Sequence, residues 1–321
     1  MNVRTASEVG FCFGVKRAIN MTRQALAEES DVFILGDLIH NRAVTGELEA
    51  RGLQKVDDIS DRRSGTMVVR AHGLPEAQLR EAHDAGLKIV DATCPIVRQA
   101  QDAARELEAR GCQLVIIGDR NHAEIKGVLG ALKHPALVVD SVEELRRAKL
   151  DKRLLRKVGV IFQTTHSFEL CQEIVTELIG MAKEVQVINT ICRPVRNRQL
   201  SAVELAGEVD VMVIVGSRSS ANTRELKHLC ATYNERTIHV ENADELDLSL
   251  FEGVEEVGVA SGLSTPPNLV EDVVARLYRA SGGTPLLGAK AAHPPSAGTR
   301  GGPLSDLQER QLAHPQAGTR E

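Results

Sequence analysis

Three of the six cysteines share one sequence setting, in which a turn leads into an expected helix. They are Cys12, Cys94 and Cys192, in the segments GFCFGVKRAI, DATCPIVRQAQ and NTICRPVRNRQ. Proline follows Cys94 directly and Cys192 by two positions, and proline favours the first turn of a helix. The amides and dipole of a helix N-terminus are expected to lower the pKa of a thiol and to favour a metal-binding thiolate. The three cysteines therefore predict one shared soft-metal centre with room for a substrate.

The wide spacing of these cysteines differs from the compact CxxC pairs of structural zinc sites. Three thiolates suit an iron–sulfur cluster, which normally takes four protein ligands. A cluster held by three thiolates would leave one iron free to act as a Lewis acid and electron donor. The remaining cysteines, Cys112, Cys171 and Cys230, stand in strand or helix patterns and are expected to be small buried hydrophobes.

Three histidines occur in polar loops at the ends of expected elements. They are His40 in DLIHNRAV, His72 in RAHGLPE and His122 in GDRNHAEIKG. A single histidine is more often structural than functional, but protonated imidazoles in such loops could hold a diphosphate through charge-assisted hydrogen bonds. Glu124, two residues after His122, is a candidate proton carrier. Thr164 and Thr165 end the strand pattern GVIFQTT and could position a substrate hydroxyl, although threonine in a strand needs no function.

The loop VGSRSSANT, residues 215–223, follows an apolar strand pattern and opens a helix. Small residues let backbone amides approach an anion, and a helix N-terminus favours negative charge. Ser220 and Asn222 could add donors to such a site, and Ser264 stands in a similar turn, ASGLSTPP. Ordinary N-capping by serine and asparagine would explain the same residues.

Composition favours a small-molecule partner. The chain has 321 residues, which suggests two or three domains, and 42% hydrophobic residues support globular cores. Aromatic residues make up 2%, the net charge is −5 and the pI is near 6.1, so neither base stacking nor a basic patch indicates nucleic acid. No apolar run approaches the roughly 20 residues that cross a bilayer. No signal peptide is expected, because the first motif begins at Gly10, and the cysteine usage indicates a reducing compartment, the cytoplasm.

Short β-rich runs such as DVFILGD and VMVIVGS alternate with helical patterns such as FELCQEIVTELIGMAK. This alternation predicts an α/β fold with parallel sheets that are covered on both faces. Ligands of open α/β sheets bind at the carboxyl ends of the strands. Because the candidate residues follow such ends, we expect one converging site. Residues 281–321 contain 7 glycines and 5 prolines, which predicts a disordered tail.

Taken together, these motifs resemble the LytB family, the hydroxymethylbutenyl diphosphate reductases that end the non-mevalonate isoprenoid pathway. The match covers roughly residues 9–280, in order and at appropriate spacing. It is carried by GFCFGVKRAI, HNRAV, AHG, DATCP, the 122–127 loop, QTT, IC followed by NRQ, VGSRSSANT and SGLSTP.

The resemblance implies a [4Fe–4S] cluster between three similar α/β domains with approximate threefold symmetry. We expect these domains at residues 13–95, 96–192 and 193–280, the last completed by an N-terminal strand within 1–12, with the tail at 281–321. The cluster would be held by Cys12, Cys94 and Cys192. The diphosphate would be bound by His40, His72, His122, Ser220, Ala221, Asn222 and Ser264.

The resemblance also implies that Glu124 delivers a proton and that Thr164 contacts the substrate. The implied reaction is a two-electron, two-proton reductive loss of an allylic hydroxyl, which gives isopentenyl and dimethylallyl diphosphates. The electrons are expected from a ferredoxin or flavodoxin, because the sequence contains no flavin or nicotinamide fingerprint. Neither nucleic acid nor a membrane is expected as a partner.

Several positions depart from the family pattern. Ala221 replaces a second serine and leaves only a backbone amide to donate, and Ala123 stands where proline is frequent. RPV at 193–195 and STPPN at 264–268 also differ. These changes leave open a divergent paralogue that binds the cluster and an anionic ligand without this turnover. A three-cysteine cluster hydro-lyase, which needs no net electron transfer, is a second alternative.

Overall fold

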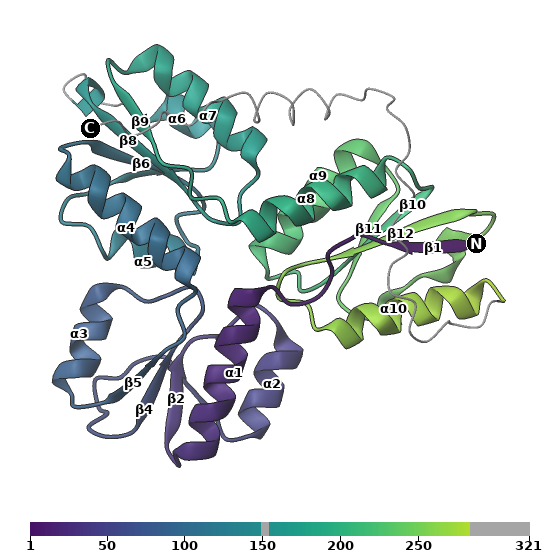
Figure 1. The fold of residues 1–321 in the computed structure, drawn as a ribbon, viewed down its shortest axis with the longest axis horizontal. Helices are drawn as coiled ribbons and strands as arrows, with labels where there is room; N and C mark the ends of the chain where they lie inside the picture. Colours follow the sequence, from purple (N-terminus) through teal and green to yellow (C-terminus); the bar gives the residue numbers. More distant parts are fainter. Residues whose placement is uncertain (149–153, 283–321) are drawn as a thin grey trace, which may run out of the picture. The chain divides into compact units, whose positions relative to one another are not determined.

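A computed structural model describes residues 1–148 and 154–282. Three four-stranded parallel sheets, each with helices packed on it, make up this part of the chain (Figure 1). The predicted α/β class with parallel sheets is therefore confirmed. No helix within the described ranges is both long and apolar enough to cross a membrane.

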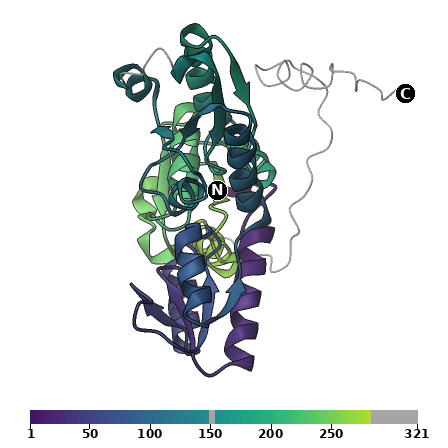
Figure 2. The same cartoon turned by 90° about the vertical axis from the view of Figure 1, so that its left-hand side faces the viewer.

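The first sheet has the strand order β3–β2–β4–β5. Its strands are β2 (Val32–Leu35), β3 (Gln54–Val56), β4 (Thr66–Val69) and β5 (Lys88–Asp91), and its helices are α1 (Phe13–Glu28), α2 (Arg42–Ala50) and α3 (Glu76–Asp84). Alternate residues of β2 and β4 pack on opposite faces: Ile34 and Val68 join one core cluster, whereas Phe33 and Met67 join another. The two clusters explain why these strands are apolar along their whole length. Figure 2 shows α1 running along one face of this sheet.

The second sheet has the order β7–β6–β8–β9. Its strands are β6 (Gln113–Ile117), β7 (Leu137–Val139), β8 (Val158–Phe162) and β9 (Val185–Val187), and its helices are α4 (Pro95–Ala109), α5 (Ala123–Leu129), α6 (Val142–Arg147) and α7 (Phe168–Met181), with a 3-10 turn at Leu154–Arg156. Helix α5 ends earlier than the pattern AEIKGVLGALK predicts. Gly130 caps it, and a Cβ there would lie 2.6 Å from the Cβ of Pro75, so this close approach requires glycine.

The third sheet has the order β1–β12–β10–β11 and joins the two ends of the described chain. Its strands are β1 (Asn2–Thr5), β10 (Val211–Val215), β11 (Thr237–Val240) and β12 (Glu256–Ser261), and its helices are α8 (Arg193–Ala206), α9 (Ala221–Tyr233) and α10 (Pro267–Ala280), with 3-10 turns at Ala243–Glu245 and Leu248–Phe251. Strand β1 pairs in parallel with β12, with Val3 opposite Val257 (Figure 1). The domain boundaries expected from the sequence remain a prediction, and the expected tail lies outside the described residues beyond Gly282.

Candidate functional site

Loops from all three sheets line one open cavity of about 100 Å³. The cavity lies at the carboxyl ends of the strands, as the sequence predicts for open α/β sheets. All the residues expected at the site line it: Cys12, Cys94, Cys192, His40, His72, His122, Glu124, Thr164, Ser220, Ala221, Asn222 and Ser264. Cys12 and Ser264, more than 250 positions apart in the chain, therefore lie at the same cavity. Their position alone does not assign a chemical role to either residue.

Each of the three cysteines is the N-cap of a helix, as the sequence predicts. Cys12 caps α1, Cys94 caps α4 and Cys192 caps α8. Their backbone N–H groups are anchored in the same way, each donating to the carbonyl two residues beyond the end of a neighbouring strand. The acceptors are Leu263 at 3.1 Å, Ala71 at 3.0 Å and Thr164 at 2.9 Å, which follow β12, β4 and β8. The same local geometry thus positions all three thiols.

The spacing of the sulfur atoms favours a group larger than one ion. A Cβ on Gly14 would lie 2.6 Å from the Cys94 Sγ and 4.0 Å from the Cys12 Sγ, so these two sulfurs face the same point. Within residues 1–148 and 154–282, however, the three thiols do not form a group compact enough for a single metal ion, whereas the three histidines do. Tetrahedral zinc with Zn–S bonds of about 2.3 Å would need sulfurs about 3.8 Å apart. Three thiols on one cavity wall at wider spacing fit a multi-iron cluster.

The expected lowering of the thiol pKa values is wrong for two of the cysteines. Burial raises the pKa of Cys94, and it raises the pKa of Cys192 to about 12. The amides of Ile96 and Val97 at the start of α4 do lower the pKa of Cys94, but by less than burial raises it. Because cysteine binds metal as a thiolate, loading this site must release protons.

Gly14 provides a direct test of the space between the sulfurs. Gly14→Ala is expected to lower the iron bound per chain strongly, because the new Cβ would contact the Cys94 Sγ. The cofactor-free variant should keep its Tm, since alanine favours a helix by up to about 1 kcal/mol. Gly46→Ala is the matched control, because a Cβ there meets nothing within 4 Å. Equal iron content in both variants would contradict this view of the site.

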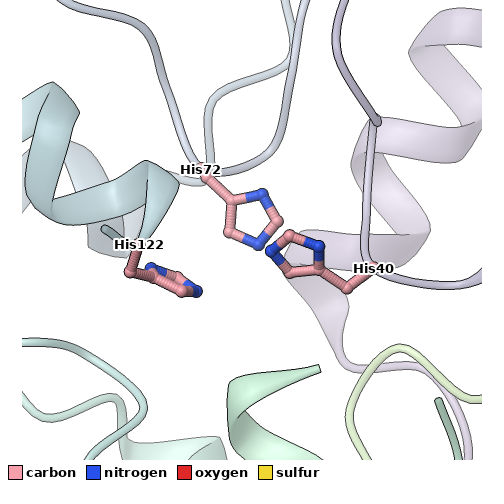
Figure 3. Close-up of side chains that lie close together, drawn as sticks. All are labelled: His40, His72 and His122. Atoms are coloured by element: carbon pink, nitrogen blue, oxygen red, sulfur yellow. The ribbon is translucent and has the colours of Figure 1, made fainter. Parts of the chain in front are cut away.

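The histidines form a compact group on the cavity wall (Figure 3). The ring centroids of His40 and His72 are 4.6 Å apart, and His122 lies 5.6 Å and 5.4 Å from them. His40 and His72 follow β2 and β4 of the first sheet, whereas His122 caps α5 of the second. Nitrogen atoms of the three rings lie within 4.8 Å of one another. One ligand group could therefore contact all three.

Burial holds the three imidazoles in the neutral form in the ligand-free protein. Burial lowers the pKa of His40 and lowers that of His72 well below its usual value. Burial and the nearby His40 lower the pKa of His122 to about 4. The trio is therefore neutral near pH 7, and a bound anion would favour its protonation.

The tautomer of His122 favours an anionic ligand over a metal ion. Its Nδ1 accepts the Glu124 backbone N–H at 3.3 Å, so the neutral ring carries its proton on Nε2. This nitrogen is then a donor and has no free lone pair for a metal. The Nδ1 of His72 is buried and has no hydrogen-bond partner within the described part of the chain.

Glu124 and Thr164 form a buried acid–hydroxyl pair beside the thiols. Glu124 is 1% exposed, and its carboxyl group accepts both the backbone N–H and the hydroxyl of Thr164 at 2.7 Å. Burial raises the pKa of Glu124 to about 7, although the two hydrogen bonds act in the opposite direction. A carboxyl group with this pKa can hold and release a proton near neutral pH.

The raised pKa of Glu124 makes stability depend on pH. Folding raises this pKa from 4.5 to about 7, so its contribution is fully present below pH 4.5 and is lost as pH rises through 7. The loss is up to about 1.4 kcal/mol of unfolding free energy per pH unit. Glu124→Gln cannot titrate, so the cofactor-free variant should gain Tm relative to wild type between about pH 5 and pH 8. A Tm difference independent of pH would contradict the raised pKa.

The start of α9 forms the wall contributed by the third sheet. Ser220 caps this helix by accepting the Thr223 N–H at 3.3 Å, so the ordinary capping role left open by the sequence is present. The Asn222 Nδ2 is buried and lacks a partner among the described residues, and it lines the cavity. Ser264 donates to the His40 carbonyl at 3.3 Å. The first residues of α9 and an unpaired side-chain amide thus line the cavity, an arrangement that suits an anion.

The sequence analysis missed two contributions to this site. Apolar side chains complete the lining, and each is within three residues of a predicted site residue: Val15, Ile39, Ala71, Ile96, Val97, Val195 and Leu263. Arg198, in the NRQ segment, is 3% exposed and donates to the carbonyls of Gly10, Ser261 and Gly262 at 2.7 to 3.0 Å. It connects the loop before Cys12 to the loop that carries Ser264.

Comparison with known proteins agrees with this architecture. The model of the family described as LytB protein matches residues 3–278. The 4-hydroxy-3-methylbut-2-enyl diphosphate reductase of Geobacter sulfurreducens is 41% identical over 277 residues, 86% of this chain and 97% of that protein. The enzyme of the same name from Aquifex aeolicus is 37% identical, over 86% of this chain and 96% of its own length.

Solved structures show the same relationship. A structure of (E)-4-hydroxy-3-methyl-but-2-enyl diphosphate reductase, the terminal enzyme of the non-mevalonate pathway, is 37% identical with a TM-score of 0.64 and covers 87% of this chain and 100% of its own. The reductase of Plasmodium falciparum, at 24% identity and a TM-score of 0.81, shares the fold over 96% of this chain and 98% of its own. From the family match, the identity and the shared architecture, we conclude that this chain belongs to the LytB family.

Proposed function

We propose that the protein reduces 4-hydroxy-3-methylbut-2-enyl diphosphate to isopentenyl and dimethylallyl diphosphates, as its relatives' name indicates. The observation that best supports this proposal is that three N-cap thiols, a buried acid–hydroxyl pair and a group of neutral histidines line the same cavity. The reaction removes an allylic hydroxyl as water and consumes two electrons and two protons. The thiols, the acid–hydroxyl pair and the histidines can each contribute to that reaction. No observation favours a paralogue without turnover.

The cofactor that fits the three thiols is a [4Fe–4S] cluster, with Cys12, Cys94 and Cys192 as its protein ligands. When bound, such a cluster supplies electrons and a Lewis-acidic iron next to the substrate. The helix N-termini at the three cysteines favour the negative charge of the thiolates.

The histidine side of the cavity is proposed to bind the diphosphate. The Nε2–H of His122 and the unpaired Asn222 Nδ2 are donors on residues that line the same cavity, and the first amides of α9 would add more. His40, His72 and Ser264 complete this wall. The apolar residues next to the thiols would pack against the five-carbon chain. Binding the diphosphate at one end therefore fixes the allylic group near Glu124 and the cysteines.

Glu124 is proposed to give the proton with which the hydroxyl leaves as water. Its pKa of about 7 keeps part of the population protonated at neutral pH. After transfer, the Thr164 hydroxyl and N–H, which already contact the carboxyl group, would stabilise the carboxylate. We further infer that a ferredoxin or flavodoxin supplies the electrons and that the enzyme works in the cytoplasm, where its six unpaired cysteines stay reduced.

An anaerobic assay with the hydroxymethylbutenyl diphosphate tests the function. The reconstituted protein should form both isomeric products only when a chemical reductant is present. Turnover without reductant would favour the hydro-lyase alternative. A loaded protein that binds the diphosphate and forms no product would instead support the non-catalytic paralogue.

Ala221 offers a test of the diphosphate wall. Ala221→Ser restores the hydroxyl that the family usually has, at a position that lines the cavity beside the start of α9. One added hydrogen bond of about 1 kcal/mol should lower the KM for the substrate by about 2- to 10-fold, with little change in kcat. Ser281→Ala, beyond the end of α10, is a control that should not change KM. An unchanged KM for Ala221→Ser would place the diphosphate elsewhere.

A further inference from the structure

The three cysteine helices carry cations at one repeated position. Lys16, Arg98 and Arg196 each lie four residues after a cysteine, and their backbone N–H groups donate to that cysteine's carbonyl at 3.0 Å. Arg17 and Arg193 add two more cations within the first five residues of α1 and α8. We call these five residues the collar cations. Every one of them is within about one helical turn of a proposed cluster ligand.

The positive charge of the collar cations lies near helix N-termini, where negative charge would stabilise the helix. Acidic residues are preferred near helix N-termini, and α3, α5, α6 and α7 each have at least one in the first turn. Helices α1, α4 and α8 have none, as is also true of α2, α9 and α10, but the three cysteine helices carry cations at matching positions instead. The chain as a whole carries a net charge of −5, so five cations on these three helices do not follow from composition.

Several collar cations are available to a partner. Lys16, Arg98 and Arg193 are exposed. Arg98 contacts Asp91, and Arg17 donates to the Thr93 carbonyl at 3.0 Å. Neither Lys16 nor Arg193 has a carboxylate within 4.0 Å among the residues that the structure describes, so both retain uncompensated charge.

Apolar side chains are exposed beside these charges. Phe13 is 68% exposed and Val9 is 39% exposed, and the two flank Cys12 in the sequence. Pro95, which follows Cys94, is also exposed. Exposed apolar side chains together with charged ones are the usual composition of a protein-docking surface.

We propose that the collar cations, together with Val9 and Phe13, form the docking surface for a small acidic electron-transfer protein. The proposal rests on the proposed reductase function, which requires electrons to reach the cysteines from outside. Positive charge next to the cysteine helices selects an acidic partner and speeds its encounter, an effect that salt weakens. A donor bound there would be separated from the thiols by little more than the first turns of α1, α4 and α8.

The test compares a protein donor with a small-molecule donor. The double variant Lys16→Gln/Arg193→Gln removes the two uncompensated charges. Its control, Arg51→Gln/Arg80→Gln, removes the same charge from exposed side chains at the C-cap of α2 and on α3. Reduced methyl viologen and a reduced, strongly acidic [2Fe–2S] ferredoxin are each used as donor to the anaerobic holoprotein, and ferredoxin binding is measured by calorimetry.

With ferredoxin at low ionic strength, the collar variant should lose about tenfold in kcat/KM and most of its salt dependence. Its iron content and its viologen-driven turnover should match those of wild type. Equal ferredoxin kinetics and binding in the collar and control variants would overturn the proposal. If wild type fails to turn over with viologen, the proposed function fails instead. The calorimetric comparison then still decides whether the collar binds an acidic protein.

Discussion

Glu124→Gln is expected to lower kcat by about 10²- to 10⁴-fold, the usual contribution of a positioned general acid. The amide keeps the size of the carboxyl group and can still contact Thr164, so the fold should be preserved. It cannot release a proton, however, and the leaving hydroxyl would depart without one. The KM for the substrate should change far less, because the Glu124 carboxyl group contacts Thr164 and is not one of the proposed diphosphate donors, and its backbone N–H, which contacts His122, is unchanged by the substitution.

The pH profile separates proton transfer from a purely structural effect. Wild-type kcat should fall as pH rises through about 7, because Glu124 loses the proton that it must donate. The residual kcat of Glu124→Gln should not fall in this way as pH rises. Glu177→Gln, at a partly exposed glutamate on α7 that does not line the cavity, is the control that should keep both rate and profile. A Glu124→Gln rate within threefold of wild type would remove this residue from the mechanism.

Cys94→Ser is expected to abolish both the cluster and turnover. Serine is nearly isosteric, but its hydroxyl is a much harder and less acidic ligand than a thiol, and iron–sulfur clusters are held by thiolates. The purified variant should lack the broad visible absorption of wild type and should bind little iron. Since Cys94 is the N-cap of α4 and serine is a good N-cap, the cofactor-free fold should remain stable.

Cys112→Ser is the matched control for this substitution. Cys112 is 8% exposed and does not line the cavity, so its loss should leave iron content unchanged at a modest cost in stability. Full iron content and activity in Cys94→Ser would show that the three N-cap thiols are not the cluster ligands. Equal loss of iron in both variants would mean that the effect is a general loss of folding.

The sequence alone predicts the strands that consist entirely of apolar residues. VFIL in β2 and VMVIV in β10 are fully buried, so an uninterrupted apolar run predicts each of them. QKV in β3 has no such run, because two of its three residues are exposed and it is held at the sheet edge by backbone pairing with β2. An edge strand of this kind leaves little signal in its side chains.

The composition of the site was also predictable, but its electrostatics were not. Strand-end positions and helix-starting prolines indicate where Cys94 and Cys192 lie. The direction of their pKa shifts depends on burial by segments far away in the sequence, and this burial outweighs the local helix amides. The same holds for His122, whose neutral state results from burial and from the nearby His40. Local sequence can identify such residues, whereas their charge is a tertiary property.

The most direct test of the account is the location of iron and diphosphate in crystals of the anaerobically prepared protein. Anomalous scattering from iron should appear inside the cavity, bonded to the Sγ atoms of Cys12, Cys94 and Cys192. In crystals soaked with the substrate, the diphosphate should lie against His40, His72 and His122. Iron bound elsewhere, or a diphosphate remote from the three histidines, would contradict the account.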